Sequence, residues 1–185
     1  MAAQRIIKVF IASPGDLAIE RRAFKDTIDD LNKGFGRGCD VKFEALGWEE
    51  TLSTVGRRPQ DVINKEIDAC DVFVLAMFRR WGQKALDAKK RGFSSYTEEE
   101  FYRALRRLEK TANPTIFAFF KHIDSGEMAS PGADLKKVLK FRKKLEKSKQ
   151  ALCSRSILLG LPIGIGYFLA VISIVAVIVL LMSLR

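Results

Sequence analysis

The feature that most constrains this chain is an uncharged run near its carboxyl end, ILLGLPIGIGYFLAVISIVAVIVLLMSL. A helix rises about 1.5 Å per residue, so a membrane core of about 30 Å needs about 20 apolar residues. The run of 28 residues exceeds that length, and buried helices of soluble domains rarely run so far without a polar face. We therefore expect residues 157–184 to form one transmembrane helix.

The basic residues of the chain gather just before this run. Residues 135–185 hold ten Lys or Arg and one acid, which leaves 32 − 10 = 22 bases and 22 − 1 = 21 acids for the remainder. Because basic flanks stay on the cytoplasmic side, we expect the N-terminal domain to face the cytoplasm. Attraction to anionic lipid headgroups explains the basicity. Membrane lipids are thus the expected partner of the span and the basic segment, and nucleic acid is not expected.

Metal binding is not indicated by the cysteine and histidine content. Cys39, Cys70 and Cys153 share no metal-ligand spacing, and His122 is the one histidine of the chain. We expect free thiols in a reducing cytosol, no metal site and no bound cofactor.

Strand-like runs alternate with helical ones in the first 121 residues. The runs are short, rich in Val, Ile and Phe, and bounded by turn residues. This alternation predicts an α/β fold with a parallel sheet covered on both faces, and we favour the flavodoxin-like strand order 2-1-3-4. The expected strands cover residues 5–13, 41–48, 71–78 and 114–121. Because both faces are covered, we expect these strand residues to be buried: Val9, Ile11, Val72, Val74, Ile116 and Phe117.

The expected organisation has three parts. An α/β domain covers residues 1–130, a basic juxtamembrane helix covers 131–156, and the transmembrane helix covers 157–184. The basic helix, from Asp134 to about Gln150, carries apolar residues that would dock it on the sheet domain.

In open parallel sheets, ligands bind beyond the carboxyl ends of the strands, where the strand order reverses. The first loop expected there is Ser13-Pro14-Gly15-Asp16. Capping explains it fully, with Ser13 as the N-cap and Asp16 as its reciprocal partner. Alternatively, Ser13 and Gly15 would let backbone N–H groups cradle a phosphate, and Asp16 would bind a ribose hydroxyl.

The second loop at this point begins FRRWG, residues 78–82. Arg79 and Arg80 could pair with phosphates, and Trp81 could stack on a base or nicotinamide ring. The alternative is a surface arginine pair with a tryptophan that closes the edge of the core.

A third element, SSYTEEEF at residues 94–101, opens a helix. Thr97 and Glu100 have the spacing of a capping box, which would explain both residues. The helix carries an apolar stripe of Phe101, Ala104, Leu105 and Leu108. At about 100° per residue, Glu99 points away from this stripe and is expected in solvent. Glu98 and Glu100 flank the stripe, and Glu100 stands where a catalytic carboxylate over the strand ends would stand.

The chain resembles the TIR-like domain of unknown function found in prokaryotic defence and signalling proteins. The resemblance rests on VFIASPGDLAIERR (9–22), DVINKEIDACDVFVLAMFRRWG (61–82) and SSYTEEEFYRAL (94–105). The family usually has Arg-Tyr-Gly after its third strand, where this chain has Arg80-Trp81-Gly82.

The wider superfamily of TIR domains and nucleoside deoxyribosyltransferases implies chemistry at an N-glycosidic bond, with NAD as a candidate substrate. Its catalytic glutamate lies on the helix after the third strand, which matches Glu100. Nicotinamide is already cationic in NAD and leaves without a general acid, so one carboxylate near the ribose suffices.

Several functions stay open from the sequence. The first is a membrane-anchored TIR-like effector that cleaves NAD in prokaryotic defence, with a nucleotide ligand and self-association expected. The others are a non-catalytic oligomerisation module, an effector whose span disrupts the membrane when clustered, and a deoxyribosyltransferase-like enzyme.

Overall fold

The computed structural model describes residues 4–36, 40–47, 59–85, 92–148 and 156–159. Within these residues the chain forms one five-stranded sheet in the order β2-β1-β3-β4-β5. Each pair of neighbouring strands is parallel. The strands are β1 (Arg5–Ala12), β2 (Val41–Leu46), β3 (Val72–Met77), β4 (Thr115–Phe120) and β5 (Ser156–Leu159).

The predicted α/β class and the order 2-1-3-4 are confirmed for the four expected strands. β5 was not predicted and extends the sheet beyond β4, with Ile157 opposite Phe117. The first three residues of the apolar run thus lie in a strand, so the predicted start of the transmembrane helix at residue 157 is wrong. Among the described residues, no helix is long and apolar enough to cross a membrane. Residues 160–184 of the predicted span lie outside that part.

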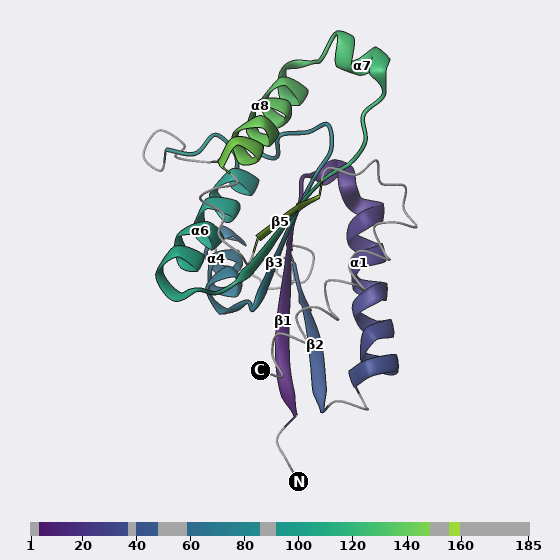
Figure 1. Cartoon of the computed structure of the whole chain (residues 1–185), viewed down its shortest axis with the longest axis vertical. Coiled ribbons are helices and arrows are strands. Elements are labelled where there is room, and N and C mark those ends of the chain that lie inside the picture. Colours follow the sequence, from purple (N-terminus) through teal and green to yellow (C-terminus); the bar gives the residue numbers. More distant parts are fainter. Residues whose placement is uncertain (1–3, 37–39, 48–58, 86–91, 149–155, 160–185) are drawn as a thin grey trace.

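Helices cover both faces of the sheet (Figure 1). α1 lies against one face, and α4, α6 and α8 lie against the other. Right-handed crossovers between parallel strands produce such a two-sided arrangement. The helical elements are η1 (Gly15–Leu17), α1 (Ala18–Leu31), η2 (Asn32–Gly36), α4 (Pro59–Ala69), α6 (Tyr96–Thr111), α7 (Ser125–Ala129) and α8 (Ala133–Lys147).

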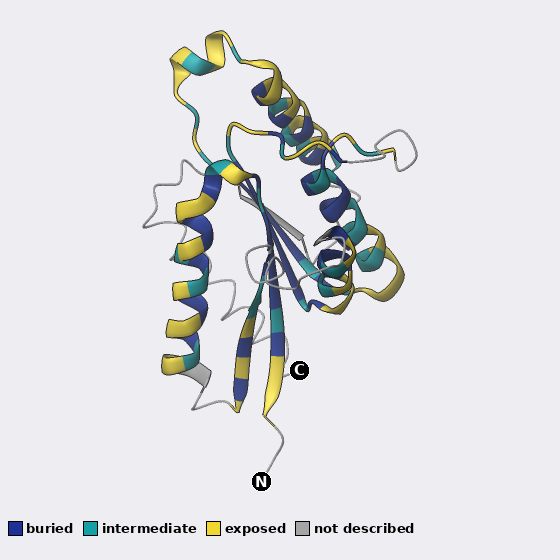
Figure 2. Ribbon diagram, turned by 180° about the vertical axis from the view of Figure 1, so that it is seen from behind, coloured by how far each residue is buried: buried dark blue, intermediate teal, exposed yellow. Residues whose placement is uncertain are grey.

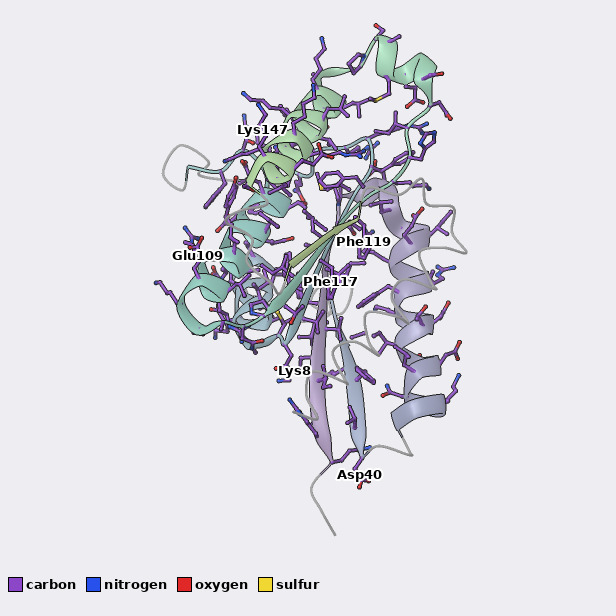
Figure 3. The ribbon with its side chains drawn as sticks, in the orientation of Figure 1. Lys8, Asp40, Glu109, Phe117, Phe119 and Lys147 are labelled. Carbon is purple, nitrogen blue, oxygen red and sulfur yellow. The ribbon has the colours of Figure 1, made fainter. Side chains whose placement is uncertain are left out.

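The core under α1 follows from the alternation of side chains along the strands. Val9 and Ile11 of β1, Val74 of β3 and Phe117 of β4 face the same side, and Phe24 of α1 is fully buried against them. Figure 2 shows the consequence on α1, whose sheet side is buried and whose outer side is exposed. Phe117 and Phe119 are labelled on β4 in Figure 3.

The opposite core joins three helices to the sheet. The alternate strand residues face this side, and two of them, Phe10 and Phe73, stack on each other with ring centroids 5.6 Å apart. Phe101 of α6 packs edge-on against both Phe73 and Phe141 of α8. The expected docking of the basic helix on the sheet domain is therefore observed, because Val138, Phe141 and Leu145 of α8 belong to this core.

The strand residues predicted to be buried are buried. Because helices cover both faces, strands in such a sheet are near-continuous in apolar residues. The predicted set, each member at most 5% exposed, is Val9, Ile11, Val72, Val74, Ile116 and Phe117.

Candidate functional site

A cavity of about 460 Å³ opens at the carboxyl ends of β1 and β3. The strand order reverses between these two strands, since β1 leads to β2 on one side and β3 to β4 on the other. Open α/β sheets bind ligands at such a point. Its walls come from the loops after β1 and β3 and from the first turns of α4, α6 and α8. The polar residues that line it are Ser13, Arg21, Gln60, Arg80, Gln83, Tyr96, Thr97, Glu100 and Asp134.

Glu100 is the buried carboxyl group of this cavity. It is 7% exposed, and Gln60 of α4 donates from Nε2 to its Oε1 over 3.4 Å. Removal from water disfavours the charged form and raises the pKa of Glu100 to about 8, with a smaller contribution from the neighbouring Glu99 and a lowering by the Gln60 hydrogen bond. A carboxyl group with this pKa can hold or release its proton near neutral pH.

Glu100 does not cap its helix, and the predicted Thr97–Glu100 capping box is wrong. α6 starts at Tyr96, and Ser95 is its N-cap, with Oγ accepting from the Glu98 amide at 3.2 Å. Glu98 instead accepts from the amide and the hydroxyl of Ser94, both at 2.8 Å. The helix therefore begins one residue before Thr97, with its N-cap two residues before the expected one, and the Glu100 side chain lines the cavity.

The expectation that Glu99 lies in solvent is also wrong, since it is only 7% exposed. Glu99 and Arg103 are one helical turn apart and share a face of α6. Arg103 forms a salt bridge with Asp68 of α4. α4 therefore packs against the face of α6 that helical periodicity predicts to be exposed to solvent.

The loop after β1 is held by a buried arginine rather than by capping. Pro14 is the N-cap of the short helix η1 and makes no side-chain capping bond, so the expected cap at Ser13 is wrong. The Arg21 guanidinium donates to Ser13 Oγ at 3.1 Å and to the Pro14 carbonyl at 2.9 Å. Gly15 lines the cavity, and a Cβ placed on it would meet no atom within 4 Å.

Asp16 connects the two loops of the site. Its Oδ2 accepts from the backbone amides of Arg79 and Arg80, each at 2.9 Å, across more than 60 residues of sequence. Asp16 is not among the residues that line the cavity. In this structure its carboxylate fixes the loop after β3 to the loop after β1, in place of the expected reciprocal capping partner.

The arginines and the tryptophan after β3 lie in different surroundings. The Arg79 side chain forms a salt bridge of 2.6 Å with Glu127 of α7, whereas Arg80 lines the cavity. Trp81 lies away from the cavity, 5% exposed in the core beside Phe141 of α8. Its indole N–H donates to Ser94 Oγ at 2.7 Å. The structure thus brings Ser13, Gly15, Arg80 and Glu100 together and leaves out Asp16 and Trp81.

Gly82 allows the loop after β3 to approach α6. Its φ of +107° lies in the region that favours glycine. A Cβ there would stand 2.7 Å from Thr97 Oγ1. Beside this close approach the Tyr96 amide donates to the Gln83 carbonyl at 3.0 Å, and Arg80 and Gln83 both line the cavity.

Arg21, Gln60 and Asp134 are among the lining residues that the sequence analysis does not single out. Two of them could have been identified from the sequence as site residues. Arg21 is in helical phase with Leu17 and Phe24, and Gln60 is in phase with Ile63, so each is a polar residue on a buried stripe. Such a residue needs a buried partner or a ligand. Asp134 reaches the cavity because α8 folds back over the strand ends, which local sequence does not encode.

A parallel sheet with helices on both faces and a cavity at its switch point defines the class of doubly wound α/β domains. Within that class, the chain belongs to the family described as Domain of unknown function (DUF4062), whose model matches residues 8–156. The match extends through α8 to the start of β5. No curated protein matches the chain.

Proposed function

We propose that this protein is a TIR-like effector that cleaves NAD at the nicotinamide N-glycosidic bond and is anchored to the cytoplasmic face of the membrane by residues 160–184. Prokaryotic defence is the setting that the resemblance implies. The observation that carries the enzymatic part is the buried carboxyl group of Glu100 on the wall of the cavity at the switch point.

In the proposed reaction the bond between ribose C1′ and the nicotinamide nitrogen breaks, and its electron pair stays on the nitrogen. The cationic ring thereby leaves as neutral nicotinamide without a proton donor. Positive charge develops on the ribose, and the ionised Glu100 carboxylate stabilises it. A water molecule then adds to C1′ and releases one proton, which gives ADP-ribose.

The raised pKa of Glu100 fits this chemistry through the charge of the substrate. In the free protein at pH 7 the carboxyl group is mostly protonated, because its pKa is about 8. A cationic nicotinamide ring close to it favours the charged form. Substrate binding would thus ionise Glu100 when the carboxylate is needed.

Other lining residues suit the rest of a dinucleotide. Arg80 has an exposed side chain on the cavity wall and is the candidate for the pyrophosphate, since Arg79 is committed to Glu127. Gly15 leaves space for a ligand to approach the backbone, and Ser13 supplies a hydroxyl beside it. Asp16 and Trp81 would act indirectly, by holding the loop after β3.

The test is whether NAD is cleaved. Full-length protein in mild detergent, clustered through a fused oligomeric tag, is incubated with NAD, and products are separated chromatographically. We expect nicotinamide and ADP-ribose in equal amounts. A clustered, folded protein that releases no nicotinamide would exclude the enzyme and favour the non-catalytic oligomerisation module.

A further inference from the structure

A second hollow, of about 860 Å³, lies between α8 and the first turns of α6. It shares no lining residue with the cavity at Glu100. Its lining is dominated by lysines of α8, and we call it the lysine groove. These lysines are Lys136, Lys137, Lys140, Lys143, Lys144 and Lys147.

Most of these lysines form no salt bridge within the described part of the chain. Four of the lysines are exposed and form no ion pair with any residue that the structure describes; they are Lys136, Lys140, Lys143 and Lys147, the last labelled in Figure 3. Their spacing places them along one face of α8, where like charges three and four residues apart destabilise a helix. A bound anion with more than one charge would remove that repulsion.

The remaining walls of the groove are not built for phosphate alone. The rings of Trp81 and Phe141 are each 5% exposed and belong to its inner wall, and Tyr102 lies beside them. Lys144 donates to the Tyr102 hydroxyl at 2.5 Å. Aromatic walls beside lysines suit a ligand with a flat ring and a charged part.

One carboxylate, that of Glu98, also lines the groove and is joined to Ser94. A carboxylate repels phosphate, but it accepts hydrogen bonds from the amino group of a base or from ribose hydroxyls. Lysines, aromatic rings and a single carboxylate together match the parts of a nucleotide. A plane of lipid headgroups would reach the lysines but would leave the inner wall empty.

We propose that the lysine groove binds a nucleotide carrying two or more phosphates. The phosphates lie against Lys140 and Lys143, and the base lies toward Trp81 and Tyr102. This site is separate from the proposed NAD cavity and does not depend on cleavage there.

The test uses ATP as the probe and full-length protein in detergent, with binding measured by titration calorimetry. The double variant K140E/K143E reverses two exposed charges of the groove. K42E/K110E makes the same change of net charge at exposed lysines on β2 and α6 that do not line the groove. We expect ATP to bind at least tenfold more weakly to K140E/K143E than to wild type, with less than a twofold change in K42E/K110E. Melting temperatures confirm that both variants are folded.

Two further probes distinguish the sources of the anion. Inorganic tripolyphosphate carries the charge without base or ribose and should bind more weakly than ATP. Vesicles of phosphatidylglycerol present a planar anionic surface and should bind K140E/K143E and K42E/K110E alike. ATP affinity that is the same in wild type and K140E/K143E would overturn the proposal, because ATP in the Glu100 cavity touches neither lysine. Loss of vesicle binding in K140E/K143E with unchanged ATP binding would assign the groove to the membrane instead.

Discussion

Gln60 Nε2 lies 3.4 Å from Glu100 Oε1, and this contact joins the first turn of α4 to the second turn of α6 at the wall of the cavity. It is the one side-chain hydrogen bond that lowers the pKa of Glu100 against the effect of burial. The amide therefore favours the ionised form on which the proposed chemistry depends.

Replacement of Gln60 by leucine should shift the pH dependence of NAD cleavage. For wild type, kcat/KM should rise with pH and reach half its maximum near pH 8, because the free protein must lose the Glu100 proton. Gln60→Leu removes a hydrogen bond to the carboxylate, so the half-maximum should move to higher pH while the plateau is kept. Initial rates from pH 6 to 10 measure both the pH of half-maximal kcat/KM and its plateau value. A plateau lost without any shift would show that Gln60 acts on the substrate rather than on Glu100.

Glu100 should also make the folded state less stable as pH rises. Its pKa is about 8 when folded and near the ordinary value of 4.5 when unfolded. Between these values the folded protein holds the proton that the unfolded chain has lost, so the free energy of unfolding falls as pH rises. The total loss is on the order of several kcal/mol.

Thermal melts of Glu100→Gln test this linkage. Because its side chain is neutral, Glu100→Gln should have a higher melting temperature than wild type at pH 8.5 and a similar one at pH 5. Glu109→Gln, on the exposed end of the same helix, is the matched control and should follow wild type at both pH values (Figure 3). Equal melting temperatures of wild type and Glu100→Gln at pH 8.5 would mean that the folded protein does not raise this pKa.

Much of the fold and of the site follows from local sequence patterns. The wrong predictions share one cause, which is that local patterns do not show which distant segments pack together. The four strands were predicted because each is a short apolar run between turn residues. The apolar stripe Phe101, Ala104, Leu105 and Leu108 predicts which face of α6 is buried. It correctly places Phe101 and Ala104 in the core. The same stripe predicts that Glu99 is exposed to solvent. This is wrong because the stripe does not show that α4 covers the opposite face of α6.

The site residues divide in the same way. Glu100 was predicted to be at the strand ends, since its position depends on the order of the elements. The hydrogen bonds from Arg79 and Arg80 to Asp16, and the burial of Trp81 against α8, depend on segments more than 50 residues away. Local capping rules could not anticipate them, and they favoured a cap that the fold does not form.

Gly82→Ala should be markedly destabilising. The residue has a positive φ, and the new Cβ would stand 2.7 Å from Thr97 Oγ1. Gly92 is the matched control, because its φ is +76° but a Cβ there would meet no atom within 4 Å. We expect a loss of about 1 kcal/mol for Gly92→Ala and at least about twice that for Gly82→Ala, by chemical denaturation. Equal losses would show that backbone strain alone matters at Gly82.

The membrane anchor predicts resistance to extraction. Full-length protein should sediment with membranes and remain there in high salt and at alkaline pH, because 25 uncharged residues, 160–184, suffice to cross the core. The double variant I172K/V175K places two charges at the centre of that segment, at a cost of roughly 5 to 7 kcal/mol, and should release the protein. The control variant M182K/L184K places the two charges at the end of the segment and should not release the protein. Release of wild type by salt alone would show that only the basic residues hold the protein at the membrane.

The central claim is tested most directly by kcat for NAD cleavage in Glu100→Gln, measured beside Glu109→Gln with both proteins clustered in the same way. Glutamine keeps the shape of the side chain and removes its charge, and Glu100 caps no helix that the change could disturb. The proposed mechanism predicts that Glu100→Gln remains folded and loses about a hundredfold or more in kcat, while Glu109→Gln keeps the wild-type rate. Nicotinamide release by Glu100→Gln at near the wild-type rate would contradict it.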